Sequence, residues 1–302
     1  MKNSSPNNSI RALLSEVVDY AGLFPPAKLS MGEAVLNYAK YKNSNFEWML
    51  GRFVVPVSRL DEFVRSARDF FNADNERGWR LSVLAGSDIY ETMSQIVEFN
   101  AEYAPHALID SIEAKAESNS DIDEIADAVP QDLATFCEIP YDGQNVGELI
   151  ATLAIKKRFA KIRMGGVTPD AFPKTWQIIR FIRTCIAANL PFKATAGLHH
   201  PVRCFKALSY EKDAPEGMMN GFLNVFLAVA FMKLAYKRSL IKELLQDEWS
   251  ESFIFDNSGV LWRQEYFLSV AQLEEVRRYS ILSFGSCSFE EPIADLQEIG
   301  ML

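Results

Sequence analysis

FAKIRMGG, residues 159–166, is a short run in which charged and apolar side chains alternate before two glycines end it. FKATAG, residues 192–197, has the same character, and an amphipathic stretch at residues 174–188 separates the two runs. A strand, a helix and another strand in this order typically form a parallel pair with a crossover helix. These stretches therefore predict a parallel α/β fold.

The same alternation runs along the rest of the chain. An N-terminal helix that Ser9 could cap comes first, and eight strands are expected at residues 19–24 (with a loop), 50–57, 80–85, 107–114, 134–139, 159–164, 191–196 and 281–284. Eight such units in 302 residues favour one closed (β/α)8 barrel of the TIM type over residues 1–302. An open doubly wound sheet would need a glycine-rich fingerprint after its first strand, where Gly22 stands alone.

Residues 198–280 interrupt this rhythm between the seventh and eighth strands. We expect a large, mostly helical insertion with an apolar helix near residues 218–236, a second helix near 240–249 and a hairpin at 253–262. Connections of this length are usually lids, binding elements or oligomer contacts. Because an apolar helix must be covered, the helices within residues 218–246 could form a homo-oligomer contact.

Composition restricts the functional classes. The chain has 31 basic and 40 acidic residues, a net charge of −9, which argues against nucleic-acid binding. No apolar run is long enough to span a bilayer, and residues 1–9 form a polar tail without a secretory signal. The four cysteines have no metal-binding or disulfide-like spacing. We expect a reduced, cytoplasmic protein without nucleic-acid or membrane partners.

Three cations mark the expected active site, because barrel enzymes react at the C-terminal ends of their strands. Alternation places Lys161 and Arg163 on the inward face of one strand, and Lys193 with Thr195 on the inward face of the next. Two roles are open. The cations could bind a small phosphorylated or carboxylated substrate. Alternatively, one lysine is a nucleophile whose pKa burial and the neighbouring cations lower.

The segment from Phe159 to Arg203 resembles the corresponding segment of deoxyribose-phosphate aldolases, which are class I barrel aldolases. That family has a Schiff-base lysine in a Lys-Thr-Ser-Thr-Gly pattern and a second lysine in a Lys-Ala-x-Gly-Gly pattern. Here the matching runs are KIRMG at residues 161–165 and KATAG at residues 193–197. The resemblance implies that Lys161 forms an imine with a carbonyl substrate and that Lys193 lowers its pKa.

An imine mechanism also needs a proton donor and acceptor. The candidates are carboxylates on the expected strands, namely Glu138 and Glu113 first, then Asp19 and Asp110. Small residues after strands six to eight could contact the substrate through their backbone N–H groups. These candidates are Gly165, Gly166, Thr195, Gly197, Gly285, Ser286 and Ser288. The alternative for the two serines is a tight turn that caps the last helix.

His199 and His200 follow the seventh strand and are candidate substrate contacts. With Glu113 or Glu138 they could instead ligate a divalent metal, although no cofactor is required by the aldolase hypothesis. Cys287 has no obvious base nearby in the sequence, so we do not expect it to be a nucleophile.

Three functions follow from these residues. The leading hypothesis is a lyase of the aldolase type that acts on a small anionic carbonyl compound through a Schiff-base lysine. The second is a metal-assisted hydrolase or lyase that uses His199, His200 and a strand-end carboxylate. The third is a non-catalytic ligand-binding or oligomeric scaffold.

Overall fold

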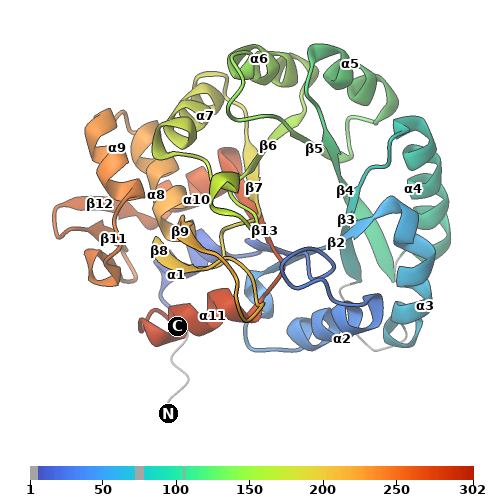
Figure 1. Cartoon of the computed structure of the whole chain (residues 1–302), viewed down its shortest axis with the longest axis horizontal. Helices are drawn as coiled ribbons and strands as arrows, with labels where there is room; N and C mark the ends of the chain where they lie inside the picture. Colours follow the sequence, from blue (N-terminus) through green and yellow to red (C-terminus); the bar gives the residue numbers. More distant parts are fainter. Residues whose placement is uncertain (1–5, 72–77, 105) are drawn as a thin grey trace.

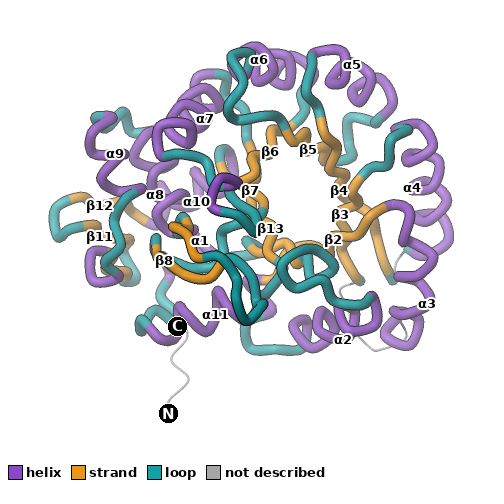
Figure 2. The backbone as a smooth tube through the Cα atoms, viewed as in Figure 1, coloured by secondary structure: helices purple, strands orange, loops and turns teal. Residues whose placement is uncertain are grey.

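A closed ring of eight parallel strands forms the centre of the protein. The computed structural model describes residues 6–71, 78–104 and 106–302, so part of the predicted N-terminal tail, residues 1–5, lies outside the described residues. The strands follow the order β1-β13-β7-β6-β5-β4-β3-β2 around the barrel. Figure 2 shows this ring in orange with the helices in purple outside it. The predicted (β/α)8 barrel of the TIM type is confirmed.

Each predicted strand forms close to its expected position. The barrel strands are β1 (Val18–Tyr20), β2 (Leu50–Pro56), β3 (Trp79–Leu84), β4 (Ala107–Lys115), β5 (Ala134–Glu138), β6 (Phe159–Arg163), β7 (Phe192–Thr195) and β13 (Ile281–Ser286). The helices around them are α2 (Met31–Lys42), α3 (Leu60–Phe71), α4 (Ile89–Tyr103), α5 (Asn119–Ala128), α6 (Val146–Lys156), α7 (Thr175–Ala187) and α11 (Glu290–Glu298).

The N-terminal helix α1 (Asn8–Leu14) begins earlier than predicted. Ser9 lies inside the helix and does not cap it, because its hydroxyl donates to the backbone oxygen of Asp256 at 2.5 Å. Arg277 donates from Nε to the Leu13 oxygen at 2.7 Å, near the end of the helix. The insertion therefore fixes α1 through hydrogen bonds between residues more than 200 positions apart in the sequence.

The insertion contains helices and two small antiparallel sheets. It holds the hairpin β8 (Cys204–Ala207) and β9 (Glu216–Met219), helices α8 (Phe222–Lys233), α9 (Arg238–Leu245) and α10 (Val270–Tyr279), and strands β10 (Phe253–Phe255), β11 (Gly259–Trp262) and β12 (Tyr266–Ser269). The predicted hairpin corresponds to β10 and β11, and β12 adds a third strand to it. In Figure 1 these elements lie together at one side of the barrel, beside α7 and α11.

Helix α8 is covered by its own chain. Every residue from Phe222 to Phe231 is buried. The Phe222 ring stacks on Phe284 of β13, with the ring centres 5.2 Å apart, and Phe231 packs on Trp262. The apolar surface that suggested an oligomer contact is therefore buried within the chain, and the homo-oligomer stays a prediction.

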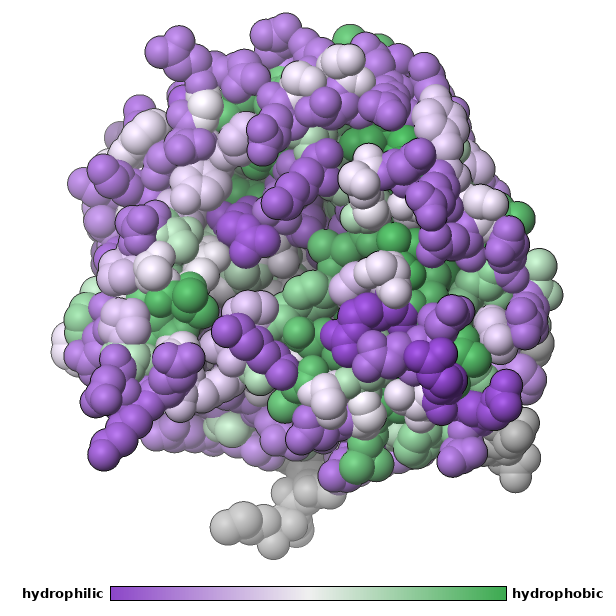
Figure 3. All heavy atoms as spheres, turned by 45° about the vertical axis from the view of Figure 1, so that its right-hand side comes forward, coloured by the Kyte–Doolittle hydropathy of each residue, from purple (hydrophilic) through white to green (hydrophobic). Residues whose placement is uncertain are grey.

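The outer surface carries mostly hydrophilic side chains. Figure 3 shows hydrophilic residues over most of one face, with hydrophobic residues gathered near its middle. Among the helices in the described ranges, none is long and apolar enough to cross a membrane.

We expect Asn224→Leu to lower the free energy of unfolding by at least about 3 kcal/mol, because each buried polar group left without a partner costs about 1–3 kcal/mol of stability. The buried Asn224 amide donates to the Leu244 and Asp247 oxygens and accepts from the Arg203 N–H. Asn224→Asp is the control, since it keeps the acceptor and loses both donors. Urea unfolding followed by circular dichroism measures the change. An Asn224→Leu protein as stable as the wild type would contradict this account of α8.

Candidate active site

Two cavities meet at the C-terminal end of the barrel. One has a volume of about 270 Å³ and is lined by Glu113, Lys161 and Arg163 together with Thr195, His199 and Cys287 among others. The other, of about 510 Å³, shares Glu113, Lys161 and Arg163 and adds Glu138 to its wall. The predicted site residues therefore lie where barrel enzymes usually bind their substrates.

Six charged side chains alternate in sign across the interior of the barrel. We call them the charge chain, and in order they are Asp19, Lys193, Glu113, Lys161, Glu138 and Arg163. The register of the strands creates this order, because Lys161 pairs with Glu138 on one side and with Lys193 on the other. With three carboxylates and three cations, the charge chain has no net charge.

The contacts within the charge chain are short. Lys193 Nζ lies 2.5 Å from Asp19 Oδ2 and 2.8 Å from Glu113 Oε1. Lys161 Nζ lies 2.7 Å from Glu113 Oε2 and 2.8 Å from Glu138 Oε2. Such ion pairs are also strong, charge-assisted hydrogen bonds.

Burial makes these contacts necessary. The side chains of Asp19, Lys193, Glu113 and Lys161 are all at most 3% exposed. An isolated charge in such a place would be very unfavourable. Each lysine has a carboxylate on both sides, so none of the four charges is buried alone.

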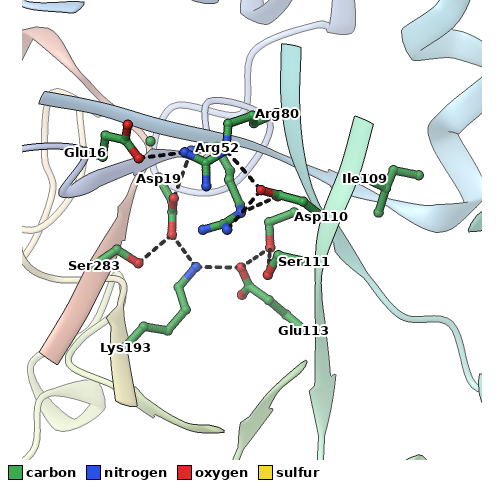
Figure 4. A network of polar contacts seen from close by, with 12 residues as sticks. Glu16, Asp19, Arg52, Arg80, Ile109, Asp110, Ser111, Glu113, Lys193 and Ser283 are labelled. Carbon is green, nitrogen blue, oxygen red and sulfur yellow. Dashed lines mark hydrogen bonds and ion pairs between the residues drawn. The ribbon is translucent and has the colours of Figure 1, made fainter. Parts of the chain in front are cut away.

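Two serines complete the hydrogen bonding of the buried carboxylates. Ser82 donates to Glu113 Oε1 at 2.7 Å, and Ser283 donates to Asp19 Oδ2 at 2.7 Å. The backbone N–H of Arg52 donates to the other oxygen of Asp19. Figure 4 shows Asp19, Glu113 and Ser283 around Lys193. Sequence reasoning missed both serines, although a serine inside an apolar strand was a signal for them.

The expected direction of the Lys161 pKa shift is wrong. Burial alone lowers the pKa of Lys161, but the negative charges of Glu113 and Glu138 outweigh burial and raise it above its ordinary value. The prediction combined burial with the neighbouring cations and did not include the carboxylates in the pKa argument. In the structure, Glu113 separates the two lysines and binds both.

The same contacts act on the carboxylates in the opposite direction. Burial alone raises the pKa of Glu113, yet the attraction of Lys161 and Lys193 leaves that pKa well below the ordinary value. Burial likewise raises the pKa of Asp19, and Lys193 and Arg52 together lower it overall. These groups are therefore ionised in the resting protein.

Asp110 lies away from both cavities. Its carboxylate binds Arg52 Nε at 2.5 Å and Arg80 Nε at 2.9 Å, and Arg80 also binds Glu16. Figure 4 shows Asp110 beside Arg52 and Arg80, above Ser111 and Glu113. The structure thus gives Asp110 ionic partners and no contact with the candidate site.

The predicted glycines divide into two groups. Gly166 and Gly285 line the smaller cavity, together with Thr195. Gly165 and Gly197 instead let two loops approach each other, since a Cβ on Gly197 would lie 2.7 Å from the Gly165 Cα and the Gly197 φ is +68°. These two are required for packing of the β6 and β7 ends and do not line the cavity.

The two serines after β13 hydrogen-bond within their own turn. Ser286 accepts from the Ser288 N–H at 3.3 Å, and Ser288 accepts from the Glu291 N–H at 3.1 Å. Neither lines the cavity. This arrangement matches the alternative that was left open, in which a serine caps the last helix.

The adjacent histidines point to different places. His199 lines the smaller cavity, and its Nδ1 lies 2.9 Å from Glu291 Oε2. His200 lies outside the cavity wall, with its Nδ1 2.5 Å from Asp295 Oδ2, and burial lowers the pKa of His200. Both carboxylates belong to α11, so the two imidazoles bind the same helix and only His199 lines the cavity.

Cys287 has a neighbour that the sequence did not reveal. Its sulfur lies 3.8 Å from the Tyr210 hydroxyl, which also donates to Glu291 Oε2 at 2.9 Å. Burial raises the pKa of the Cys287 thiol to about 11. The thiol is therefore protonated near neutral pH, in agreement with the expectation that it is not a nucleophile.

The metal hypothesis finds no assembled ligand set. Within the described residues, no group of three or more His, Cys, Asp and Glu side chains could hold a metal ion. His199 and His200 bind Glu291 and Asp295 of α11 in place of the expected Glu113 or Glu138, and the metal site stays a prediction.

Comparison of the chain with protein-family models, curated proteins and solved structures finds no match. Barrels of this type support many unrelated activities, so the fold alone does not assign one. The functional argument therefore depends on the residues of the site.

We expect Lys193→Met to lower the free energy of unfolding by about 3–5 kcal/mol, because it leaves Asp19 without its cation in the barrel interior. Adding Asp19→Asn should restore part of the loss, and a double-mutant cycle by urea unfolding measures the coupling. Lys242→Met is the control, since that lysine is exposed on α9. Equal losses in the single and double variants would contradict this interpretation.

The pKa shifts also predict a pH window for stability. A carboxylate whose pKa is lowered in the folded protein stabilises the fold at pH values above its ordinary pKa near 4. This stabilisation is lost as the pH falls through the lowered pKa. Because its pKa is raised in the folded protein, Lys161 stabilises the fold at pH values below its ordinary pKa near 10. This stabilisation is lost as the pH rises through the raised pKa. We expect Glu113→Gln to weaken the loss of stability below about pH 4. Urea unfolding at several pH values tests this, and an unchanged acid dependence would argue against it.

Proposed function

We propose that the protein is an enzyme of the class I aldolase type, which binds a small carbonyl compound as a Schiff base on Lys161. The observation that carries this proposal is the position of Lys161. Its amine is buried between two carboxylates and still lines both cavities at the barrel mouth. Lys193 lies behind it and lines neither cavity.

The carboxylates supply a route for the proton that Lys161 must lose. An ammonium cannot attack a carbonyl carbon, and the pKa of Lys161 is raised in the resting protein. Glu138 and Glu113 lie within 2.8 Å of its Nζ, so a proton can pass along either hydrogen bond. A substrate that expels water from the cavity favours the neutral amine and acid over the ion pair, because burial disfavours charge.

Imine formation then starts from the neutral Lys161 amine, which adds to the carbonyl carbon. The carbonyl oxygen leaves as water with the two amine hydrogens. The nitrogen of the remaining C=N bond takes back the proton that Lys161 had passed to the carboxylate, which gives an iminium. Lys193 keeps Glu113 oriented while this occurs. Ser82 holds the same carboxylate from another side.

Arg163 supports an anionic substituent on the substrate. Its side chain is 48% exposed, and its Nε binds Glu138. Its Nη groups have no hydrogen-bond partner among the residues that the structure describes, so they remain available to a carboxylate or phosphate. Gly166 and Gly285 give the same cavity two positions without side chains.

Borohydride trapping tests the proposal. We expect acetaldehyde, acetone or pyruvate with sodium borohydride to add one reduced adduct per chain, which peptide mass spectrometry places on Lys161. Lys161→Arg should abolish the adduct, because it keeps the positive charge and removes the nucleophile. Lys242→Arg is the matched control and should retain it. A wild-type protein that forms no Lys161 adduct with any of the three probes would overturn the proposal.

A further inference from the structure

The carboxylates beside Lys161 are already engaged. Glu113 binds Lys161 and Lys193 with its two oxygens, and Glu138 binds Lys161 and Arg163 with its own. The pKa of each is held below its ordinary value, because the attraction of the cations outweighs burial. In the resting protein all four of their oxygens are bound to cations, so a third group is needed to transfer protons at the substrate carbon.

Among the residues that the structure describes, His199 is the histidine that lines the smaller cavity. Its side chain is 8% exposed, and its Nδ1 is held by Glu291 Oε2 at 2.9 Å. Burial alone raises the pKa of Glu291, but its contacts, with the His199 hydrogen bond first among them, lower that pKa overall. Glu291 is therefore an ionised acceptor, and His199 Nδ1 is the donor. Nε2 remains as the ring nitrogen that can act on a substrate.

Glu291 is itself fixed by two further contacts. Tyr210, in the loop of the β8–β9 hairpin, donates to the same oxygen that His199 contacts. Ser288 accepts from the Glu291 backbone N–H, which fixes the start of α11. A base that is oriented by a carboxylate, which is held in turn by other groups, is a recurring arrangement at sites of proton transfer.

We propose that His199, oriented by Glu291, is the general acid and base of the reaction at Lys161. This inference rests on the proposed function. In the condensing direction, Nε2 takes a proton from the carbon next to the imine carbon. The C–H electron pair forms a C=C bond, and the iminium nitrogen on Lys161 becomes a neutral enamine nitrogen.

The second half of the reaction returns the proton. The enamine carbon attacks an acceptor aldehyde, whose C=O electron pair moves to oxygen, and that oxygen takes the proton from His199. The iminium forms again, and water hydrolyses it to release the product and the Lys161 amine. Glu291 is a positioning residue in this scheme because it touches His199 and not the reacting atoms.

Several ionisable groups surround the imidazole. Glu291 binds its Nδ1, the His200 ring centre lies 6.4 Å away, and Tyr210 reaches it through Glu291. Cys287 shares the cavity wall. A pH profile must therefore be assigned to His199 by substitution and not by its midpoint alone.

Deuterium exchange into acetone and pyruvate tests the first half of the reaction without an acceptor aldehyde. The wild-type protein in D2O should exchange the hydrogens next to the carbonyl, as followed by NMR. His199→Asn keeps a donor near the Nδ1 position and lacks Nε2, so exchange should slow about 100-fold or more. The borohydride adduct on Lys161 should be unchanged, which also shows that the site is folded.

His200→Asn is the matched control, because His200 binds Asp295 as His199 binds Glu291 but lies outside the cavity wall. We expect its exchange rate to stay within twofold of wild type. Glu291→Gln should slow exchange less than His199→Asn and should move the imidazole limb of the pH profile. A merely structural Glu291 would not move that limb.

The outcomes separate the two proposals. A wild-type protein that forms no Lys161 adduct overturns both. An adduct without deuterium exchange, or exchange in His199→Asn within twofold of wild type, overturns the role of His199 and leaves the Schiff base standing. Loss of the adduct in His199→Asn also overturns the role of His199, because it would then be needed to hold the site.

Discussion

The charge chain is the constraint on which the rest of the barrel interior depends. TIM barrels normally fill this space with branched apolar side chains. Here four charged groups are almost fully buried, and each is tolerated only because its neighbours carry the opposite sign. A well-packed apolar interior would often be at least as stable as such ion pairs. The arrangement is therefore better explained by chemistry than by stability.

The charge chain also limits what that chemistry can be. A cluster of unpaired cations would bind an anion, but Lys161 and Lys193 are already neutralised by carboxylates on both sides. Among the three cations, Arg163 alone reaches well into solvent, at 48% exposed. In the proposed function, binding of an anionic group and activation of a nucleophile therefore fall to different residues.

The sequence predicted the barrel and the direction of its lysines because both depend on local periodicity. The alternation in residues 159–164 is enough to turn Lys161 inward once the strand is recognised. The partners of the lysines are not local. Asp19 and Glu113 reach Lys193 from 174 and 80 residues away. The sequence offered these carboxylates as candidates but not their contacts with the lysines, so the direction of the Lys161 pKa shift was inferred incorrectly.

The insertion has the same nonlocal character. His199 stands at its start, Tyr210 lies in its first hairpin, and Glu291 follows the last barrel strand. These three residues meet because β13 lies beside β7 in the ring, which brings both ends of the insertion to one edge of the mouth. In the sequence they are a loop histidine, a tyrosine of the insertion and a glutamate of the last helix. Only closure of the barrel turns them into one hydrogen-bonded group, whose His199 shares a cavity wall with Lys161.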